Sequence, residues 1–250
     1  MRSARYWVPA FIVLFACYQA PQAFRTPLLM LAFLPVAWLV ARALALRMGP
    51  AYALEWNRRA ALLLGGGFLL ALLAKLTAVI AGAGLGIYTF APAHSVPFTE
   101  ILQVIGWTSI YTFVPSIAED ILTRGFWARV PAWRWTAWRF VSFSAIVYVL
   151  NHIYRLGNGP TEWAMLFCFG LAYATAFWRT GTLWAAVGLH WGWNFAGPFL
   201  GGWWNYDRPG SGWWLSAIAH LLIAAICLLG FSRAAGVSAT APAPAPAAGR

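Results

Sequence analysis

Apolar side chains fill eight long runs of the sequence, separated by short stretches rich in arginine, proline and glycine. The runs span residues 7–23, 28–46, 61–88, 100–123, 138–155, 161–178, 182–199 and 213–232. An α-helix needs roughly 20 apolar residues, with a range of about 17–25, to cross the hydrocarbon core of a bilayer. The pattern therefore predicts an all-α polytopic integral membrane protein, a bundle of about eight transmembrane helices.

The third run is longer than one crossing requires and holds Lys75 near its middle, so it fits either one tilted helix or a broken pair. The basic residues favour one helix. With eight crossings, thirteen of the 17 basic residues fall on the side of the N-terminus and three on the other, a bias that a broken third run would destroy. We therefore expect a bacterial inner (cell) membrane protein with both termini in the cytoplasm. We expect Lys75 to snorkel or to pair with a helix dipole rather than to bind a substrate carboxylate or a lipid headgroup.

The composition agrees with a membrane protein. Hydrophobic residues make up 62% of the chain and charged residues 9%, whereas soluble domains carry about 25% charged residues. The net charge of +11 would indicate nucleic-acid binding in a soluble chain. Here, however, the arginines lie between apolar runs, as topology signals and contacts to anionic lipids. The lipid bilayer is thus an expected partner, and nucleic acid is not.

The start of the chain resembles a signal peptide but lacks a small-residue cleavage site, so we expect an uncleaved first helix. Residues 1–99 then hold transmembrane helices 1–3, residues 100–199 hold helices 4–7 with the chemically active side chains, and residues 200–232 hold helix 8. Residues 233–250 are rich in alanine and proline and are expected to form a disordered tail. The three cysteines lie in apolar runs without pairing motifs and are expected to be inert thiols.

Two adjacent acids, Glu119 and Asp120, end the fourth apolar run of a chain that has six acidic residues in all. An ionised side chain at the centre of a membrane helix costs about 2.5–3.5 kcal/mol on insertion scales, so its presence indicates a function. Asp120 and Arg124 lie four residues apart on one helical face, where they can form an ion pair. Glu119 is rotated by about 100° from its neighbour and can act as a base. The alternative is a charge cluster that only holds helices together.

Two later runs each carry a histidine and, one helical turn away, a second side chain that can act together with the imidazole. Tyr148 precedes His152 by four residues, so its ring can cover the imidazole. His190 and Asn194 share a face and could donate hydrogen bonds to one anionic oxygen, although each could instead be structural. At about 1.5 Å per residue, these groups and Glu119 reach similar depths, which predicts one membrane cavity open toward the arginine-rich side. His152 fits least well, because its predicted helix must tilt or start late.

The motifs EDxxxR, YxxxH and HxxxN resemble, in order and spacing, the EExxxR, FxxxH and HxxxN signatures of the CAAX-protease and bacteriocin-processing family, abbreviated CPBP or Abi. This family includes the type II CAAX prenyl endopeptidases. The resemblance covers residues 100–199, and RTGTLWAAVGLHWGWN is similar to the family's approach to its last motif. Asp120 replaces the usual second glutamate and Tyr148 the usual phenylalanine, so a carboxylate and an aromatic ring are kept at these positions.

The resemblance implies an intramembrane endopeptidase that cleaves a membrane-associated protein or peptide. Glu119 and His152 would activate the attacking water, and His190 and Asn194 would stabilise the oxyanion of the tetrahedral intermediate. The ion pair beside Glu119 would hold the base in place. No cofactor is favoured, and zinc bound by Glu119, His152 and His190 is the alternative.

Two other functions compete with proteolysis. A proton-coupled transporter or channel would need polar residues through the whole membrane depth, whereas here they gather at one level. A catalytically silent family member would act as a scaffold or a bacteriocin-immunity factor, and the intact set of glutamate, histidines and asparagine disfavours this role. His94 and His220 belong to no motif and are interpreted as structural residues.

Overall fold

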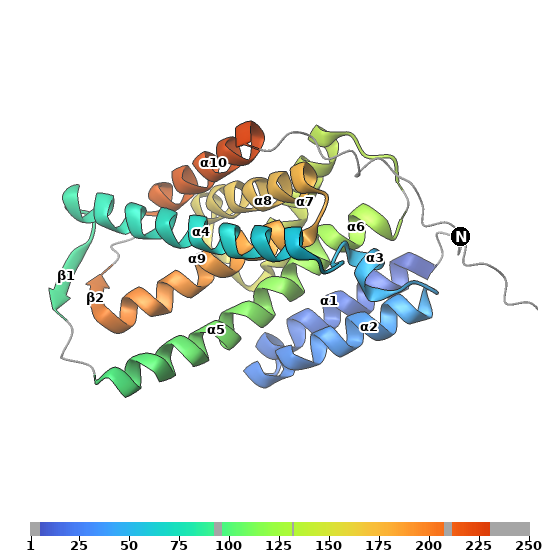
Figure 1. The fold of residues 1–250 in the computed structure, drawn as a ribbon, viewed down its shortest axis with the longest axis horizontal. Coiled ribbons are helices and arrows are strands. Elements are labelled where there is room, and N and C mark those ends of the chain that lie inside the picture. The colour runs from blue at the N-terminus through green and yellow to red at the C-terminus, as the bar shows by residue number, and fades with distance from the viewer. Residues whose placement is uncertain (1–5, 93–96, 132, 208–211, 231–250) are drawn as a thin grey trace, which may run out of the picture.

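The computed structural model of the chain describes residues 6–92, 97–131, 133–207 and 212–230, and almost all of their regular structure is helical (Figure 1). In chain order the elements are α1 (Trp7–Ala23), the 3₁₀ turns of η2 (Pro27–Ala32), α2 (Phe33–Ala43), α3 (Met48–Tyr52), α4 (Arg58–Gly84), β1 (Thr89–Pro92), α5 (Phe98–Asp120), the π-helical turn η3 (Ile121–Gly125), α6 (Phe126–Arg129), α7 (Ala137–Asn151), the 3₁₀ turns of η4 (Ile153–Asn158), α8 (Pro160–Thr180), α9 (Leu183–Trp203), β2 (Trp204–Asp207) and α10 (Trp213–Gly230).

All eight apolar runs form helical segments, which confirms the helical class. The exception is a short antiparallel pair, β1 with β2, which sets Thr89 opposite Asp207 and which the sequence did not predict. Within the described residues, three helical spans are long and apolar enough to cross a membrane: Arg58–Gly84, Thr99–Arg129 and Trp213–Gly230. The chain is thus a helical membrane protein, and the number of about eight crossings stays a prediction.

The helix boundaries refine the predicted segments. The third run forms one uninterrupted helix, α4, so the alternative of a broken pair is wrong. α9 extends to Trp203, and the predicted boundary between residues 199 and 200 therefore falls inside a helix. The predicted tail at 233–250 and His94 lie outside the described residues. Figure 1 places β1 and β2 at one end of the bundle, and α3, α6 and the start of α1 at the other.

α9 packs against α4, α5 and α8. Gly188 and Gly192 approach α4 so closely that an added Cβ would collide with the backbone carbonyls of Leu64 and Phe68. Small residues four positions apart allow two membrane helices to approach in this way. His190 lies between the two glycines in sequence, points away from α4 and reaches α5.

α7 begins close to its predicted start but ends early, at Asn151. The next residue, His152, has φ −85° and ψ 50°, outside the helical region, and the chain continues into η4. Of the two expectations for this helix, the late start is therefore wrong, and the tilt stays a prediction. An early end, instead, leaves His152 at the terminus of α7.

The fourth run is one continuous helical span that contains the π-helical turn η3 directly after Glu119 and Asp120. All five residues of η3 are buried, and the turn contacts α1, α3, α7 and α9. A Cβ at Gly125 would lie 3.0 Å from the carbonyl oxygen of Tyr52, so glycine permits the close contact with α3. Single π turns inside α-helices are frequent at functional sites. The turn brings several helices together beside the two acids.

Candidate active site

Glu119 lies at the centre of a buried polar cluster in the last turn of α5. Its side chain is 5% exposed. Oε1 accepts a hydrogen bond of 3.0 Å from Nδ2 of Asn151 and lies 3.4 Å from Nδ1 of His152. Oε2 lies 3.5 Å from Nε2 of His190 on α9. The structure thus brings the predicted base together with both predicted imidazoles, whereas an opening toward the arginine-rich side stays a prediction.

Asp120 and Arg124 form the expected ion pair, and both side chains are fully buried. The guanidinium of Arg124 also lies over the rings of Tyr148 and Tyr173, 5.5 Å from each centroid. The thirteen basic residues counted on the side of the N-terminus included Arg124. That assignment was wrong, because the charge of Arg124 is neutralised inside the bundle. Without it, the bias of basic residues becomes twelve against three.

His190 connects the two acids, because each ring nitrogen faces a different carboxylate. Nδ1 lies 3.1 Å from Oδ1 of Asp120, and an ionised carboxylate only accepts hydrogen bonds, so Nδ1 carries the hydrogen. In the neutral ring, Nε2 is then an acceptor that faces Oε2 of Glu119 across 3.5 Å. His190 can therefore donate a hydrogen bond from Nε2, to Glu119 or to an oxyanion, only when the ring carries a second proton.

His152 holds its Nδ1–H on the backbone of α7. Its Nδ1 lies 2.8 Å from the carbonyl oxygen of Tyr148, and a carbonyl only accepts, so this nitrogen also carries the hydrogen. The ring of Tyr148 packs beside the imidazole with centroids 4.8 Å apart, as the four-residue spacing predicted. The His152 side chain is 15% exposed, more than that of Glu119 or His190. It is thus the most accessible of the three groups.

Asn194 lies one turn beyond His190 on α9 and is only half-buried. Its Nδ2 donates a hydrogen bond of 3.2 Å to Oγ of Ser116, which lies one turn before Glu119 on α5. The carboxamide is therefore held beside the cluster through a serine, rather than by direct contact with the base. Ser116 donates in turn to the carbonyl oxygen of Thr112 at 2.7 Å, so its orientation is fixed by its own helix.

Residues 100–196 match the family model described as Rce1-like, type II CAAX prenyl endopeptidase. The match confirms the family resemblance of the three motifs. It runs from α5 into α9, and we call this span the Rce1-like segment. At the level of the family, it supports an intramembrane protease of the CAAX type, with membrane-embedded substrates. None of the curated proteins matches the chain.

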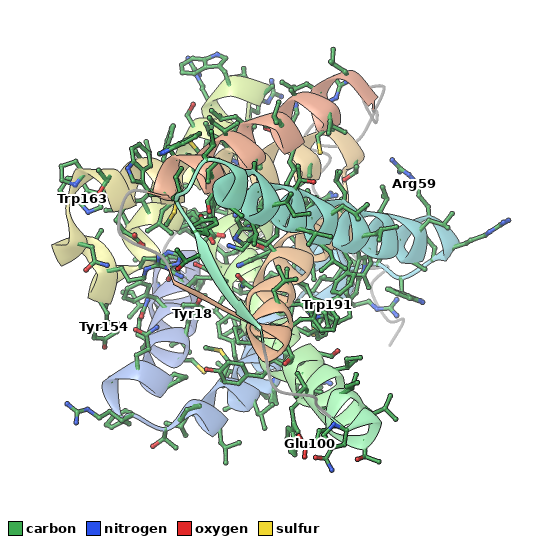
Figure 2. The ribbon with its side chains drawn as sticks, turned by 90° about the vertical axis from the view of Figure 1, so that its left-hand side faces the viewer. Tyr18, Arg59, Glu100, Tyr154, Trp163 and Trp191 are labelled. Carbon is green, nitrogen blue, oxygen red and sulfur yellow. The ribbon has the colours of Figure 1, made fainter. Side chains whose placement is uncertain are left out.

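Two polar residues outside the three motifs support Glu119, the predicted base. Asn151 donates to Glu119, and Gln19 of α1 donates to the backbone oxygen of Asn151 at 2.8 Å and to its Oδ1 at 3.1 Å. The neighbouring Tyr18 also interacts with Glu119 and Asn151, and Figure 2 shows it within the molecule, on α1. The sequence signal for this contact was weak: two polar side chains, Tyr18 and Gln19, in an otherwise apolar run.

His220 of α10 is linked to the Rce1-like segment through a tyrosine. Its Nδ1 lies 2.8 Å from the carbonyl oxygen of Ser216, so Nε2 is the acceptor and takes a 2.9 Å hydrogen bond from the hydroxyl of Tyr173. The face of Tyr173 stacks on His190, with centroids 4.8 Å apart and an interplanar angle of 20°. His220 therefore orients the ring that supports His190, in keeping with a structural role.

Lys75 lies inside the bundle rather than at its surface. The side chain is 6% exposed, and Nζ lies 4.4 Å from the centroid of the Trp193 ring. Snorkelling was therefore the wrong expectation, because protein covers the ammonium group. The same Trp193 ring packs edge-on against His220, at 4.3 Å between centroids. Lys75 is therefore connected to His220 through Trp193.

The arrangement of the histidines also tests the zinc alternative. Among the residues that the structure describes, no three His, Cys, Asp or Glu side chains are grouped as metal ligands. His152 and His190 each hold Nδ1–H on a hydrogen-bond acceptor, the carbonyl oxygen of Tyr148 and the carboxylate of Asp120, so Nε2 of each neutral ring carries the lone pair. Nε2 of His190 faces Oε2 of Glu119 across 3.5 Å, whereas the nitrogen of His152 that lies 3.4 Å from Glu119 is the protonated Nδ1. Zinc held by Glu119, His152 and His190 therefore stays the alternative to metal-free catalysis.

Proposed function

We propose that the chain is an intramembrane endopeptidase that hydrolyses a peptide bond of a membrane-associated protein or peptide without a metal ion. The observation that carries the proposal is the environment of Glu119. Glu119, one of the six acidic residues in the chain, is almost completely buried. It lies within hydrogen-bonding or near-contact distance of one amide and two imidazoles. A carboxylate held in this way can take a proton from water.

In the proposed reaction, the oxygen of a water molecule attacks the carbonyl carbon of the substrate, and Glu119 takes the proton that the water loses. Nδ2 of Asn151 donates to the carboxylate and holds it oriented for this step, with the imidazole of His152 beside it. When the tetrahedral intermediate collapses, the C–N bond breaks, and the proton passes from Glu119 to the leaving nitrogen. The base is then regenerated as a carboxylate.

The same proposal assigns the oxyanion to His190 and Asn194. Preorganised donors that face a developing negative charge contribute strongly to rate. Nδ2 of Asn194 would exchange its hydrogen bond to Ser116 for one to the oxyanion. His190 would donate from Nε2 as an imidazolium, whose Nδ1–H stays on Asp120, and Asp120 is in turn neutralised by Arg124.

The decisive test compares Glu119→Gln with Glu100→Gln. Both glutamates belong to α5, but Glu100 lies in its first turn and is exposed. We expect Glu119→Gln to abolish cleavage with the fold intact, because an amide cannot take the proton, and Glu100→Gln to retain it. The substrate would be identified as the membrane protein that accumulates uncleaved in cells that express only Glu119→Gln. Full cleavage by a well-folded Glu119→Gln protein would refute the role of Glu119 as base.

A further inference from the structure

A cavity of about 840 Å³ lies where the end of α2 leads through α3 to the start of α4. Its wall includes two arginines, Arg42 and Arg47, and two tryptophans, Trp38 and Trp56. None of these residues belongs to the three motifs of the Rce1-like segment. Figure 1 shows α3 at the end of the bundle opposite β1 and β2.

The charge of this cavity favours an anion. Arg42 and Arg47 are exposed, and the guanidinium of Arg42 lies 5.0 Å from the centroid of the Trp38 ring, which limits its motion. Glu55 is the one acidic residue of the wall. α4 begins directly after the cavity. Asn57 caps it by accepting a hydrogen bond from the backbone N–H of Ala60, and the first turn has no acidic residue to offset the partial positive charge of the helix N-terminus.

The rim of the cavity is apolar and faces outward. Trp38 is 44% exposed and Trp56 61%. The ring of Trp56 is held edge-on against Trp184, with centroids 4.9 Å apart. In a membrane protein, large exposed apolar side chains contact acyl chains, and tryptophan rings gather at the level of the headgroups. The cavity therefore joins a cationic wall to an apolar rim, which is the complement of an amphiphile with a negative head.

We propose that this cavity binds the phosphate headgroup of one anionic phospholipid. Arg42 and Arg47 contact the phosphate, since charge-assisted hydrogen bonds to phosphate oxygens are among the strong ones that arginine makes. Trp38 and Trp56 contact the glycerol and the upper acyl chains. The site is independent of peptide hydrolysis, and the proposal does not rest on the proposed protease activity.

The test measures binding of phosphatidylglycerol to the purified full chain by native mass spectrometry in detergent, with phosphatidylcholine as the neutral lipid. Each basic residue near an anionic lipid contributes enough to change affinity by about fivefold, so the double variant Arg42→Gln, Arg47→Gln should lose about twenty-five-fold. Glu55→Gln should bind more tightly than the wild type, because the one acidic side chain of the wall is removed.

The matched control is Arg139→Gln. Arg139 also lies over an exposed tryptophan, at 5.3 Å from the ring of Trp138, but outside the cavity. This variant should bind phosphatidylglycerol like the wild type. Equal losses in the control and the double variant, or no loss in the double variant, would overturn the proposal. Soluble glycerol phosphate should not displace the lipid; full displacement would make the site one for a free phosphate ester instead.

Discussion

Replacing Asp120 with asparagine removes one charge of a fully buried ion pair and leaves the other without its partner. Breaking a buried pair in this way costs about 3–5 kcal/mol. The cost should fall in the upper part of this range, because Nε and Nη2 of Arg124 have no hydrogen-bond partner among the described residues. A loss of about 4–5 kcal/mol corresponds to a fall in melting temperature of about 8–20 °C for a chain of this size.

The double variant Asp120→Asn, Arg124→Met separates the charge effect from the loss of packing. Replacing both members of a buried pair is often neutral, and an asparagine oxygen can still accept the Nδ1–H of His190. The double variant should therefore recover most of the lost stability. The assay is thermal unfolding of the purified full chain in detergent, followed by tryptophan fluorescence.

A surface ion pair provides the control for this measurement. Glu162→Gln breaks the pair with Arg155, whose side chain is 46% exposed, and such pairs contribute at most about 1 kcal/mol. If Asp120→Asn shifted the melting temperature no more than this control, the pair would not be buried as described. If the double variant were no more stable than the single one, the effect of Asp120 would not pass through Arg124. If both Glu119→Gln and Asp120→Asn folded normally and Asp120→Asn alone were inactive, the two acids would have exchanged roles.

Three further changes test the remaining parts of the site. Asn194→Ala should lower kcat by about 10²–10³ with little change in KM, because an oxyanion donor acts in the transition state; steady-state kinetics that show only a rise in KM would contradict this. Tyr173→Phe keeps the ring that stacks on His190 but loses the hydrogen bond to His220, so melting should fall by the equivalent of about 1 kcal/mol while the cleavage rate is kept; a large loss of rate would give the hydroxyl a chemical role. Treatment with 1,10-phenanthroline should leave activity unchanged, whereas a loss that added zinc restores would make His190 a metal ligand.

The sequence by itself determined which segments are helical. Backbone N–H and C=O groups in hydrocarbon must be satisfied within their own segment, so a long apolar run has few alternatives to a helix. For the same reason, the contacts between residues four positions apart were predictable. The Asp120–Arg124 pair and the packing of Tyr148 on His152 both follow from local helical geometry.

The tertiary structure alone decided which polar side chains contact one another in the site. Gln19 reaches Asn151 across 132 positions of sequence, and no local pattern indicates that α1 supports the base. The early end of α7 and the burial of Lys75 were likewise missed. Which nitrogen of His190 faces which carboxylate depends on how closely α9 approaches its neighbours. Helices form from local hydrogen bonds, whereas the geometry of a buried site depends on packing between segments that are distant in sequence.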